Sequence, residues 1–465
     1  MEVSLTVPVE KCKDLGELED VVRKEVCKAG RELMRKALEE KDEGLMRSRG
    51  PGLRQVGKRK RTITTMLGDM TFERRLYRDE RSGQCRFLLD EALNLPYRGS
   101  LSERVATFAL SVAGDSAYRR TAKVLKQALP HGVSASAVQK QVWRFGARVE
   151  KAEAAKQEAT FGKGEVPEKG QEAISRFFVE GDGVNVALQR EKERRCEVKV
   201  GIGYTGWEAV GQDRHRVTGK VVHTGVEKPG AFWERFWLTA YERYDLSGLE
   251  YVVVNGDGAN WIPEGLMGLP GVHQLDRFHL WESLREAFNF DDPSAGKIYQ
   301  EATGGAWEGV ERLIVEALSR EGLSASQREA IGQVYGYLAA NRDGLRDWRD
   351  RVASQPGDRS MGAMEGNIDK LIAIRAKRRG MSWRLPGIHS MAKLQQCLYE
   401  GNVGVYACAS RPNTEKRAQP KKNVMQKSRG SATPFNAVLP ALAGSAADRP
   451  LARTLRALIN PQSIC

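Results

Sequence analysis

Residues 177–183 read FFVEGDG, and residues 251–258 read YVVVNGDG. Each apolar run predicts a buried β-strand that ends at an aspartate, Asp182 in the first run and Asp257 in the second. A third acid, Glu365, lies in a stretch that we predict to be helical. A single Asp-Gly pair usually marks a turn. Two such pairs, each ending an apolar strand, together with a helical acid, indicate a set of hard oxygen ligands for divalent cations.

The order of the elements around the two aspartates indicates a fold class. The sequence predicts three strands, a helix, a strand, a helical turn and a last strand. This is the order of the ribonuclease-H-like fold, whose first and fourth strands are neighbours, so we expect an α/β core of this class with Asp182 beside Asp257. The predicted ranges are 174–189, 196–204 and 216–226 for the first three strands, 230–244 for the helix, 250–254 for the fourth strand, 259–267 for the turn and 272–275 for the last strand.

The third acid is far from the second along the chain. The spacings are 75 residues from Asp182 to Asp257 (257 − 182) and 108 residues from Asp257 to Glu365 (365 − 257). Helical patterns over 280–288, 307–318, 325–340 and 344–352 fill most of the second interval, which predicts an all-α insertion rather than a loop. A helix over 361–379 then returns Glu365 to the sheet. Other acids considered for its role are Glu264, Glu282, Glu301 and Glu308, of which the first two lie too close to Asp257 to follow such an insertion.

The N-terminal region predicts an α+β unit that binds DNA. A helix over 15–47 precedes a β-hairpin of strands 58–67 and 70–78 around Gly68-Asp69. A helix over 118–129, a break at Pro130-His131-Gly132 and a helix capped by Ser134 or Ser136 fit a helix-turn-helix. A solvated edge hairpin and a plain helical hairpin are the alternatives. The basic residues assigned to DNA here are Lys58, Arg59, Lys60, Arg61, Arg74 and Arg75 on the hairpin, and Lys140 and Arg144 on the last helix.

The net charge of +14 is unevenly distributed. Residues 51–150 hold 19 Lys/Arg against 9 Asp/Glu, and residues 366–465 hold 17 against 4, whereas residues 151–365 carry an excess of acids. Two basic arms suit a polyanion, because each neutralised phosphate releases counterions. The acidic middle suits a metal site, although a basic solvated surface is the simpler alternative for the arms.

Length and composition exclude several classes of protein. The 465 residues allow two or three domains. They contain no apolar run of about eighteen residues, and the start of the chain lacks a signal-peptide layout, so we expect no membrane segment and a cytoplasmic protein. The seven cysteines are odd in number, far apart and without a Cys-x-x-Cys pair. This pattern indicates a reduced compartment and no structural zinc site.

These patterns divide the chain into predicted domains. A polar stretch over 151–170 is predicted to be a linker. The domains are an N-terminal helix (1–50), a basic hairpin and helix-turn-helix-like DNA-binding region (51–150), the first part of the ribonuclease-H-like core (171–290), the helical insertion (291–358), the final core helix with the third acid (359–408), and a basic, largely disordered tail (409–465).

The chain resembles a family of bacterial insertion-sequence transposases. The ordered set of matching segments is more specific than any one of them. They are Gly68–Arg75, Leu88–Leu93, Ser116–Arg119, Val179–Val184, Gly256–Ile262, Leu275–His279, Met364–Asn367 and Arg375–Trp383. On these segments the chain looks like a DDE transposase of the ISLre-type family, formerly an uncharacterised protein family. The resemblance spans roughly residues 55–400.

The resemblance implies an activity, cofactors and partners. The expected enzyme is a DDE-type DNA transposase that cleaves DNA at element ends and transfers the freed 3′-hydroxyl into target DNA. Asp182, Asp257 and Glu365 would be its catalytic, metal-binding acids, holding two Mg²⁺ or Mn²⁺ ions. Its partners would be terminal inverted repeats, target DNA and further copies of itself, as a homodimer or higher synaptic assembly. Its location would be the bacterial cytoplasm, associated with the nucleoid.

Further residues receive accessory roles, each with an alternative. Asp276 and His279 are similar to an Asp-x-x-His motif of transposases, in which the histidine contacts the scissile phosphate or orients the site; the alternative is a histidine that caps or packs a helix. Trp261 and Trp383 are candidates for stacking on an unpaired base, with core packing as the alternative for Trp261. The cations expected to meet phosphate after the third acid are Arg375, Lys377, Arg378 and Arg379, with a solvated basic helix as the alternative.

Two other functions fit the sequence. A catalytically silent DNA-binding protein derived from a transposase is one, although all three acids are retained. A ribonuclease-H-like nuclease that cuts without strand transfer is the other, and only a joined product on target DNA separates it from a transposase.

Overall fold

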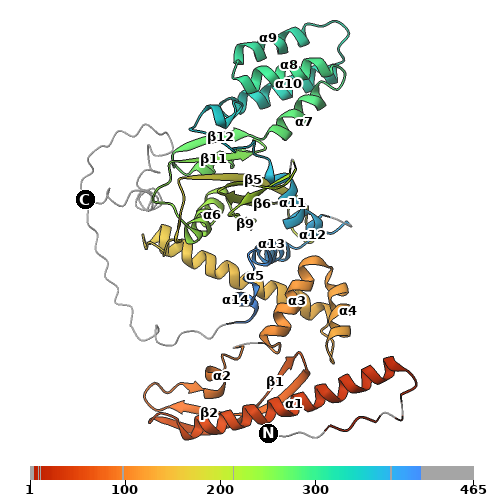
Figure 1. The fold of residues 1–465 in the computed structure, drawn as a ribbon, viewed down its shortest axis with the longest axis vertical. Coiled ribbons are helices and arrows are strands. Elements are labelled where there is room, and N and C mark those ends of the chain that lie inside the picture. Colours follow the sequence, from red (N-terminus) through yellow and green to blue (C-terminus); the bar gives the residue numbers. More distant parts are fainter. Residues whose placement is uncertain are drawn as a thin grey trace, which may run out of the picture. The chain divides into compact units, whose positions relative to one another are not determined.

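The computed structural model describes residues 5–8, 10, 12–96, 99–212, 214–377 and 380–409. They form two units, one of residues up to 149 with 401–409, the other of residues 150–400 (Figure 1). The predicted domains 1–50 and 51–150 therefore belong to a single unit. The core was predicted to run to residue 408, but residues 401–409 return to the first unit. The predicted tail 409–465, apart from Ala409, lies outside the described residues.

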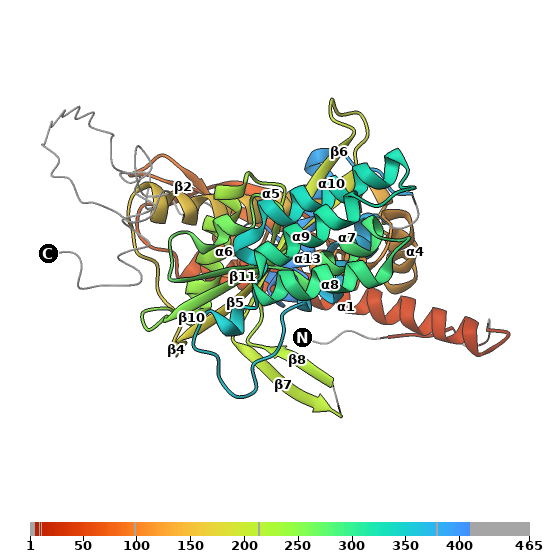
Figure 2. The ribbon, with the colours of Figure 1, turned by 90° about the horizontal axis from the view of Figure 1, so that it is seen from above.

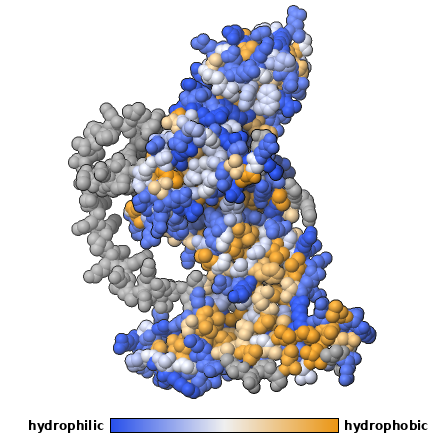
Figure 3. All heavy atoms as spheres, viewed as in Figure 1, coloured by the Kyte–Doolittle hydropathy of each residue, from blue (hydrophilic) through white to orange (hydrophobic). Residues whose placement is uncertain are grey.

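The first unit is built on one long helix and a hairpin. α1 (Leu15–Arg47) has the predicted bounds and begins at Asp14, whose side chain accepts a hydrogen bond from the Glu17 amide. Its partly buried Leu38 and Leu45 pack against the core of the hairpin. Other apolar residues of α1 are exposed, and the surface of this unit is rich in hydrophobic residues in the view of Figure 3.

The hairpin pairs β1 (Leu53–Thr65) with β2 (Gly68–Asp79), and β3 (Cys85–Arg86) adds a short third strand. The turn was predicted at Gly68-Asp69, but Thr65 pairs with Gly68, so the two loop residues are 66 and 67. The Thr65 hydroxyl donates to the Gly68 carbonyl and accepts from the Leu67 amide. These bonds within the loop move the turn two residues earlier than the Gly-Asp pair indicated.

Buried ion pairs hold the hairpin to its neighbours. Asp42 of α1 is 3% exposed and accepts from the Arg75 side chain at 2.7 Å and from the Arg75 amide at 3.3 Å. Asp90, 2% exposed, pairs with Arg61 at 2.9 Å and with Arg74 at 3.1 Å. Three arginines that were assigned to DNA thus place their guanidinium groups on carboxylates inside the unit.

Helices complete the first unit. The helix-turn-helix prediction corresponds to α4 and the start of α5, and Ser134 accepts from the Ala137 amide as expected of a cap. The Arg148 side chain donates to the Tyr406 and Ala407 carbonyls, which fixes the returning segment. The helices are α2 (Leu88–Ala92), α3 (Glu103–Asp115), α4 (Tyr118–Ala128), α5 (Ala135–Gln157) and α14 (Val403–Ala407).

The second unit contains a five-stranded mixed sheet in the order β12-β11-β5-β6-β9. β5 and β6 are antiparallel, as are β6 and β9, whereas β5, β11 and β12 are parallel. The first and fourth strands of this sheet are therefore neighbours. The strands are β5 (Arg176–Ala187), β6 (Arg195–Tyr204), β9 (Val221–Gly225), β11 (Tyr251–Gly256) and β12 (Gly271–Leu275).

Alternation along β5 assigns the two faces of the sheet. Phe177 and Val179 point into a core formed with the aromatic residues of α6 (Pro229–Arg243), including Trp233. Phe178 points to the other face, where its ring lies against Tyr204 and Trp348. On the edge strand β9, Thr224 bonds to α13 (Leu385–Tyr399) through the Ala392 carbonyl.

The predicted strand over 216–226 is two strands in the structure. β8 (Arg214–Thr218) pairs with β7 (Gly206–Gly211) in a side hairpin, and only β9 joins the main sheet. Figure 2 shows this hairpin projecting from the sheet. Short strands β4 (Glu172–Ala173) and β10 (Tyr244–Asp245) pair separately, and the predicted turn at 259–267 contains the 3-10 helix Pro263–Leu266.

The all-α insertion lies between β12 and the third acid. Its helices share a core that includes Leu280, Ile314 and Leu338. The predicted helix 344–352 is instead two 3-10 turns, Arg342–Gly344 and Trp348–Asp350, and the helix over 292–304 was not predicted. The helices are α7 (Arg277–Ala287), α8 (Asp292–Gly304), α9 (Trp307–Leu318) and α10 (Ala325–Ala340) (Figure 1).

Two further stretches differ from prediction. The linker expected over 151–170 begins as helix, since α5 continues to Gln157 and a π-helical turn follows to Gly162. The helix expected over 361–379 is one continuous helix over 363–376 that contains a π-helical turn: α11 (Ala363–Ile368), the turn (Asp369–Ala373) and α12 (Ile374–Ala376). Among the described residues, no helix is long and apolar enough to cross a membrane.

The buried Asp42–Arg75 pair predicts a large stability effect. Replacing Asp42 with alanine removes the carboxylate 2.7 Å from the buried Arg75 guanidinium and leaves it with Glu43, at 3.6 Å, which we expect to destabilise the first unit by up to about 3–5 kcal/mol. Urea unfolding followed by circular dichroism measures the change. The control is Arg59→Ala on the exposed side of β1, expected to change stability by less than about 0.5 kcal/mol. Equal stabilities of the two variants would contradict the prediction.

Candidate active site

Parallel pairing of β5 with β11 brings two acids to the same level of the sheet. Gly181 pairs with Gly256, the last pair between these strands, so Asp182 and Asp257 follow adjacent positions. Asp257 comes directly after β11, but Asp182 was wrongly predicted to end its strand, because β5 continues to Ala187 in its pairing with β6. A Cβ atom at Gly256 would lie 2.8 Å from the Gly181 carbonyl oxygen, so glycine permits this close approach. The predicted side-by-side placement of the two aspartates follows directly from this register.

One pocket gathers the residues predicted to act together. Its lining comes from the middle of β5, the end of β11, the residue after β12, and the first turns of α7 and α11. The residues are Gly181, Asp182, Asn255, Gly256, Asp257, Asp276, Phe278, His279, Gly362, Met364 and Glu365. The structure thus unites the three candidate acids with Asp276 and His279, although the insertion separates them in sequence.

The pocket disfavours the ionised form of Asp182. Burial raises the pKa of Asp182 to about 6, and the negative charges of Asp257 and Glu365 act in the same direction. The Gly183 amide, 2.6 Å from Oδ1, and His279 partly offset the rise. Three carboxylates near one another with one pKa raised make the site receptive to cations.

The Asp257 turn is held by the helical insertion. The Asp257 side chain accepts from the Ala259 amide at 2.9 Å, and its carbonyl accepts from the Tyr337 hydroxyl of α10 at 2.8 Å. Gly258 has a φ of +93°, and a Cβ atom there would meet Tyr337 at 2.9 Å. The insertion therefore contacts the backbone of the second acid.

Glu365 is exposed in the first turn of α11, and the residue that anchors this turn was not predicted. Glu180, fully buried on β5, accepts from the backbone amides of Gly362, Ala363 and Met364. Burial raises its pKa, while these hydrogen bonds and one from Tyr204 oppose the rise. An acid inside the apolar run FFVEGDG is the sequence signal that marks it.

In the Asp-x-x-His motif after the second acid, Asp276 has a structural role. This residue caps α7: Oδ1 accepts from the Phe278 and His279 amides, and Oδ2 accepts from the Asn255 side chain at 2.8 Å. The His279 side chain is partly exposed, lines the pocket and lies 4.0 Å from Glu282. The His279 side chain is therefore accessible from the pocket, and its predicted contact with a substrate phosphate stays a prediction.

The two tryptophans are buried. Trp261 is 7% exposed and packs between the rings of Phe232 and Trp233, which corresponds to the core-packing alternative. Trp383 is also 7% exposed, and its indole N–H donates to the Ala376 carbonyl at 3.0 Å. Neither ring is available for base stacking as the structure stands, because protein atoms surround both.

The basic residues assigned to DNA fall into two groups. Those with internal positions are Arg61, Arg74 and Arg75, in the ion pairs described above, and Arg375, which is 5% exposed with its guanidinium over Trp383. For these four the phosphate assignment is corrected, because protein groups already engage them. Those with exposed positions are Lys58, Arg59, Lys60, Lys140, Arg144 and Lys377. Arg378 and Arg379 lie outside the described residues.

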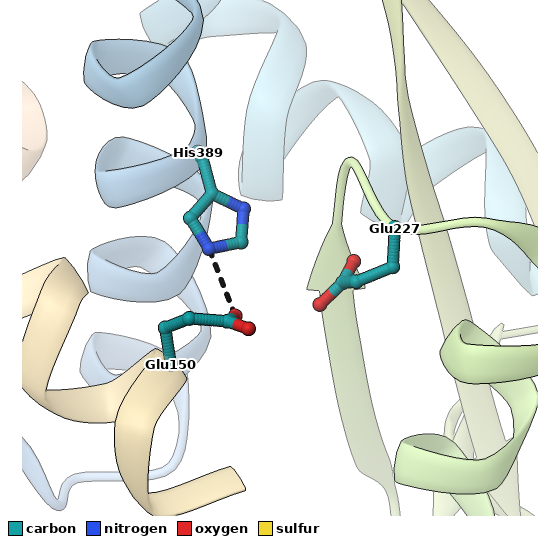
Figure 4. A group of neighbouring side chains, drawn as sticks. All are labelled: Glu150, Glu227 and His389. Atoms are coloured by element: carbon teal, nitrogen blue, oxygen red, sulfur yellow. Dashed lines mark hydrogen bonds and ion pairs between the residues drawn. The ribbon is translucent and has the colours of Figure 1, made fainter. Parts of the chain in front are cut away.

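A second cluster of titratable residues lies around Glu227 (Figure 4). Glu150 and His389 are 3.0 Å apart, and among the described residues the sets of three potential ligands within 4.8 Å of one another are Glu150, Glu227 and His389, and Glu153, His223 and Glu227. The pocket acids form no set this close.

Protein cations already occupy the second cluster. The Lys393 ammonium lies 2.7 Å from Glu153 and 2.9 Å from Glu227, and Arg235 lies 2.8 Å from Glu150. Burial lowers the pKa of His223 to about 4, and the Lys393 charge adds to this effect. With two cations against its three carboxylates, the cluster forms an ion-pair network, and we assign no metal to it.

Comparison with known proteins identifies relatives of this chain. UPF0236 protein TTE2489 of Caldanaerobacter subterraneus subsp. tengcongensis is 26% identical over 388 residues, 83% of this chain and 79% of that protein. UPF0236 protein TTE0402 of the same organism is 26% identical over 339 residues, 73% of this chain and 64% of that protein.

A search of solved structures finds the Drosophila P element transposase strand transfer complex. It covers 66% of this chain and 80% of that chain at 10% identity, with a TM-score of 0.22, which is too low to support a statement about this fold. The family comparison is more informative, because one family model matches residues 9–405. The chain therefore belongs to the Uncharacterised protein family (UPF0236).

Proposed function

We propose that the protein is a DDE-type DNA transposase with a ribonuclease-H-like catalytic core and an all-α insertion. The observation that carries the proposal is the pocket shared by Asp182, Asp257 and Glu365. Asp182 lies on β5, Asp257 directly follows the neighbouring parallel strand β11, and Glu365 lies on a helix after the insertion. The strand order and directions of the sheet support the fold assignment.

The donor set of the pocket fits two hard divalent cations. Carboxylate oxygens are the ligands that Mg²⁺ and Mn²⁺ prefer. Asp182, Asp257 and Glu365 would hold the ions between them. Bound there, the ions would supply Lewis-acid activation of a water or a 3′-hydroxyl and charge stabilisation for the leaving oxygen. His279 lines the same pocket and would orient the phosphate.

The proposed substrates are the terminal inverted repeats of the element and target DNA. Exposed cations of the first unit, such as Lys58 and Arg144, are suited to the phosphate backbone. Two element ends have to be held together, so we propose that the working form is a homodimer or a larger assembly of this chain. Its location would be the bacterial cytoplasm, on the nucleoid.

Loss of either Asp182 or Glu365 should strongly reduce excision. With the gene's own flanking DNA on a reporter plasmid, we expect Asp182→Asn and Glu365→Gln each to lower excision by roughly 10²–10³-fold or more, because metal stabilisation is worth several kcal/mol. The matched control is Glu282→Gln, an exposed acid near His279, which should retain excision. Full loss of excision in Glu282→Gln would contradict the assignment of Glu365 as the third acid. Cleavage of the DNA without a joined product would indicate a nuclease rather than a transposase.

The crowded carboxylates should also affect stability. The folded pKa of Asp182, about 6, lies above the ordinary value of about 3.9, so the folded state binds this proton more tightly and loses stability as pH rises from about 4 through 6. Asp182→Asn should therefore stabilise the metal-free protein at pH 7.5, by at most about 3 kcal/mol, and have little effect near pH 4. Thermal unfolding in EDTA measures this.

The same unfolding experiment tests cation binding. Adding Mg²⁺ at pH 7.5 should raise the Tm of the wild type, because a ligand that binds only the folded state stabilises it. The Tm of Asp182→Asn should not respond. A response of equal size in both proteins would show that Mg²⁺ binds elsewhere.

The exposed cations of β1 should contribute to DNA affinity. Replacing Lys58, Arg59 and Lys60 with alanine should reduce the slope of log K against log salt by about 2–3, since each phosphate contact contributes about 0.9. Fluorescence anisotropy with a duplex of the flanking DNA measures the slope. Lys24→Ala/Lys28→Ala on α1 removes exposed charge outside the hairpin, and an equal reduction there would contradict a specific role for β1.

A further inference from the structure

Glu180 is an acid in the middle of a buried strand. It lies two residues before Asp182 on β5, so the two side chains point to the same face of the sheet. Glu180 is 0% exposed, between Val179 and Gly181 in the most apolar part of the strand. Burying a carboxylate without partners is strongly unfavourable, so its surroundings should show what stabilises it.

Four hydrogen bonds surround this carboxylate. Oε1 accepts from the Tyr204 hydroxyl at 2.6 Å, the Gly362 amide at 3.2 Å and the Ala363 amide at 3.0 Å. Oε2 accepts from the Met364 amide at 3.0 Å. Three of the four donors are consecutive backbone amides at the start of α11, which immediately precede Glu365.

The start of α11 has no cap of its own. Gly362 is its N-cap residue, has a φ of 137° and offers no side chain to accept from the first-turn amides. Glu180 supplies the oxygen atoms that Ser, Asp or Asn would supply in an ordinary cap.

This contact links the first acid to the third. Glu365 follows the helical insertion in the chain, and the covalent connection alone does not fix the position of Glu365 relative to β5. The Glu180 carboxylate ties the residues before Glu365 to the strand that carries Asp182. We propose that Glu180 is a positioning residue that holds Glu365 at the metal pocket by accepting the first amides of α11. This inference rests on the proposed function.

Mn²⁺ affinity tests the inference, measured by titrating full-length protein while following the EPR signal of the free ion. Glu180→Gln retains the side-chain shape but replaces one accepting oxygen with an NH₂ group, so that a side-chain N–H faces a backbone N–H of α11 and the hydrogen bond between them is lost. We expect it to weaken Mn²⁺ binding by about 10-fold or more, as does loss of other outer-shell partners of metal sites. The matched control is Tyr204→Phe, which removes a hydrogen bond to the same carboxylate but leaves α11 bound, and should change affinity by less than about threefold.

A double-mutant cycle separates positioning from general destabilisation. If Glu180 acts through Glu365, Glu180→Gln should add no further loss of Mn²⁺ affinity to a Glu365→Gln protein. Equal losses in both backgrounds, or an unchanged affinity in Glu180→Gln, would overturn the inference. Glu180→Asp retains the carboxyl group on a side chain that is shorter by one methylene. It replaces Glu180→Gln in the same cycle if that variant does not fold.

Amide exchange distinguishes failure of this inference from failure of the proposed function. Hydrogen exchange at residues 363–368 should speed up in Glu180→Gln and remain near wild type in Tyr204→Phe. If the wild type does not bind Mn²⁺, or if Asp182→Asn does not reduce that binding, then both the proposed metal site and the positioning role of Glu180 at that site are wrong, even if exchange is faster in Glu180→Gln. If wild type binds Mn²⁺ and exchange at α11 is unchanged in Glu180→Gln, only the positioning role falls.

Discussion

The parallel pairing of β5 with β11 is the constraint on which the site depends. With Gly181 opposite Gly256, the pairing of the two strands ends at this level, and the next residue of each strand is an aspartate, although β5 itself continues to Ala187. A one-residue shift would turn one side chain to the opposite face. The α6 core fixes the register, because Val179 of β5 and Val252 and Val254 of β11 are all buried in it. The packing of apolar side chains on one face thus determines where the acids lie on the edge.

Each acid depends on a different support. Asp182 is fixed by its strand, the Asp257 turn by Tyr337 of the insertion, and the Glu365 turn by Glu180. Placing three carboxylates in one pocket raises the pKa of Asp182, so the folded protein holds mutual repulsion that a bound cation would relieve. Neighbouring residues such as Tyr337 and Glu180 hold the backbone of the acids in place against that repulsion.

The sequence predicted what local pattern determines. α1, α9 and α10 were predicted with their observed bounds, since strong helical periodicity and caps such as Ser324 act locally. Charge alone did not distinguish Arg59, which is exposed, from Arg75, which pairs with Asp42 of a helix 33 residues away. The cap from Glu180 also depends on a contact between distant segments. Such contacts have no local signature in a single sequence.

Two clusters of acids in the second unit show why ligand type alone does not define a metal site. Around Glu227, carboxylates and histidines converge within 4.8 Å, yet Lys393 and Arg235 already supply positive charge at hydrogen-bond distance. Around Asp182 the carboxylates are less closely gathered, but no cation is among the residues that line the pocket, and only His279 lowers the pKa from a side chain. A cation entering the cluster around Glu227 would have to displace an ammonium group, whereas one entering the pocket around Asp182 would neutralise charge that the protein leaves uncompensated. The difference in charge compensation, more than the geometry of the free side chains, favours the pocket around Asp182 as the place for divalent ions.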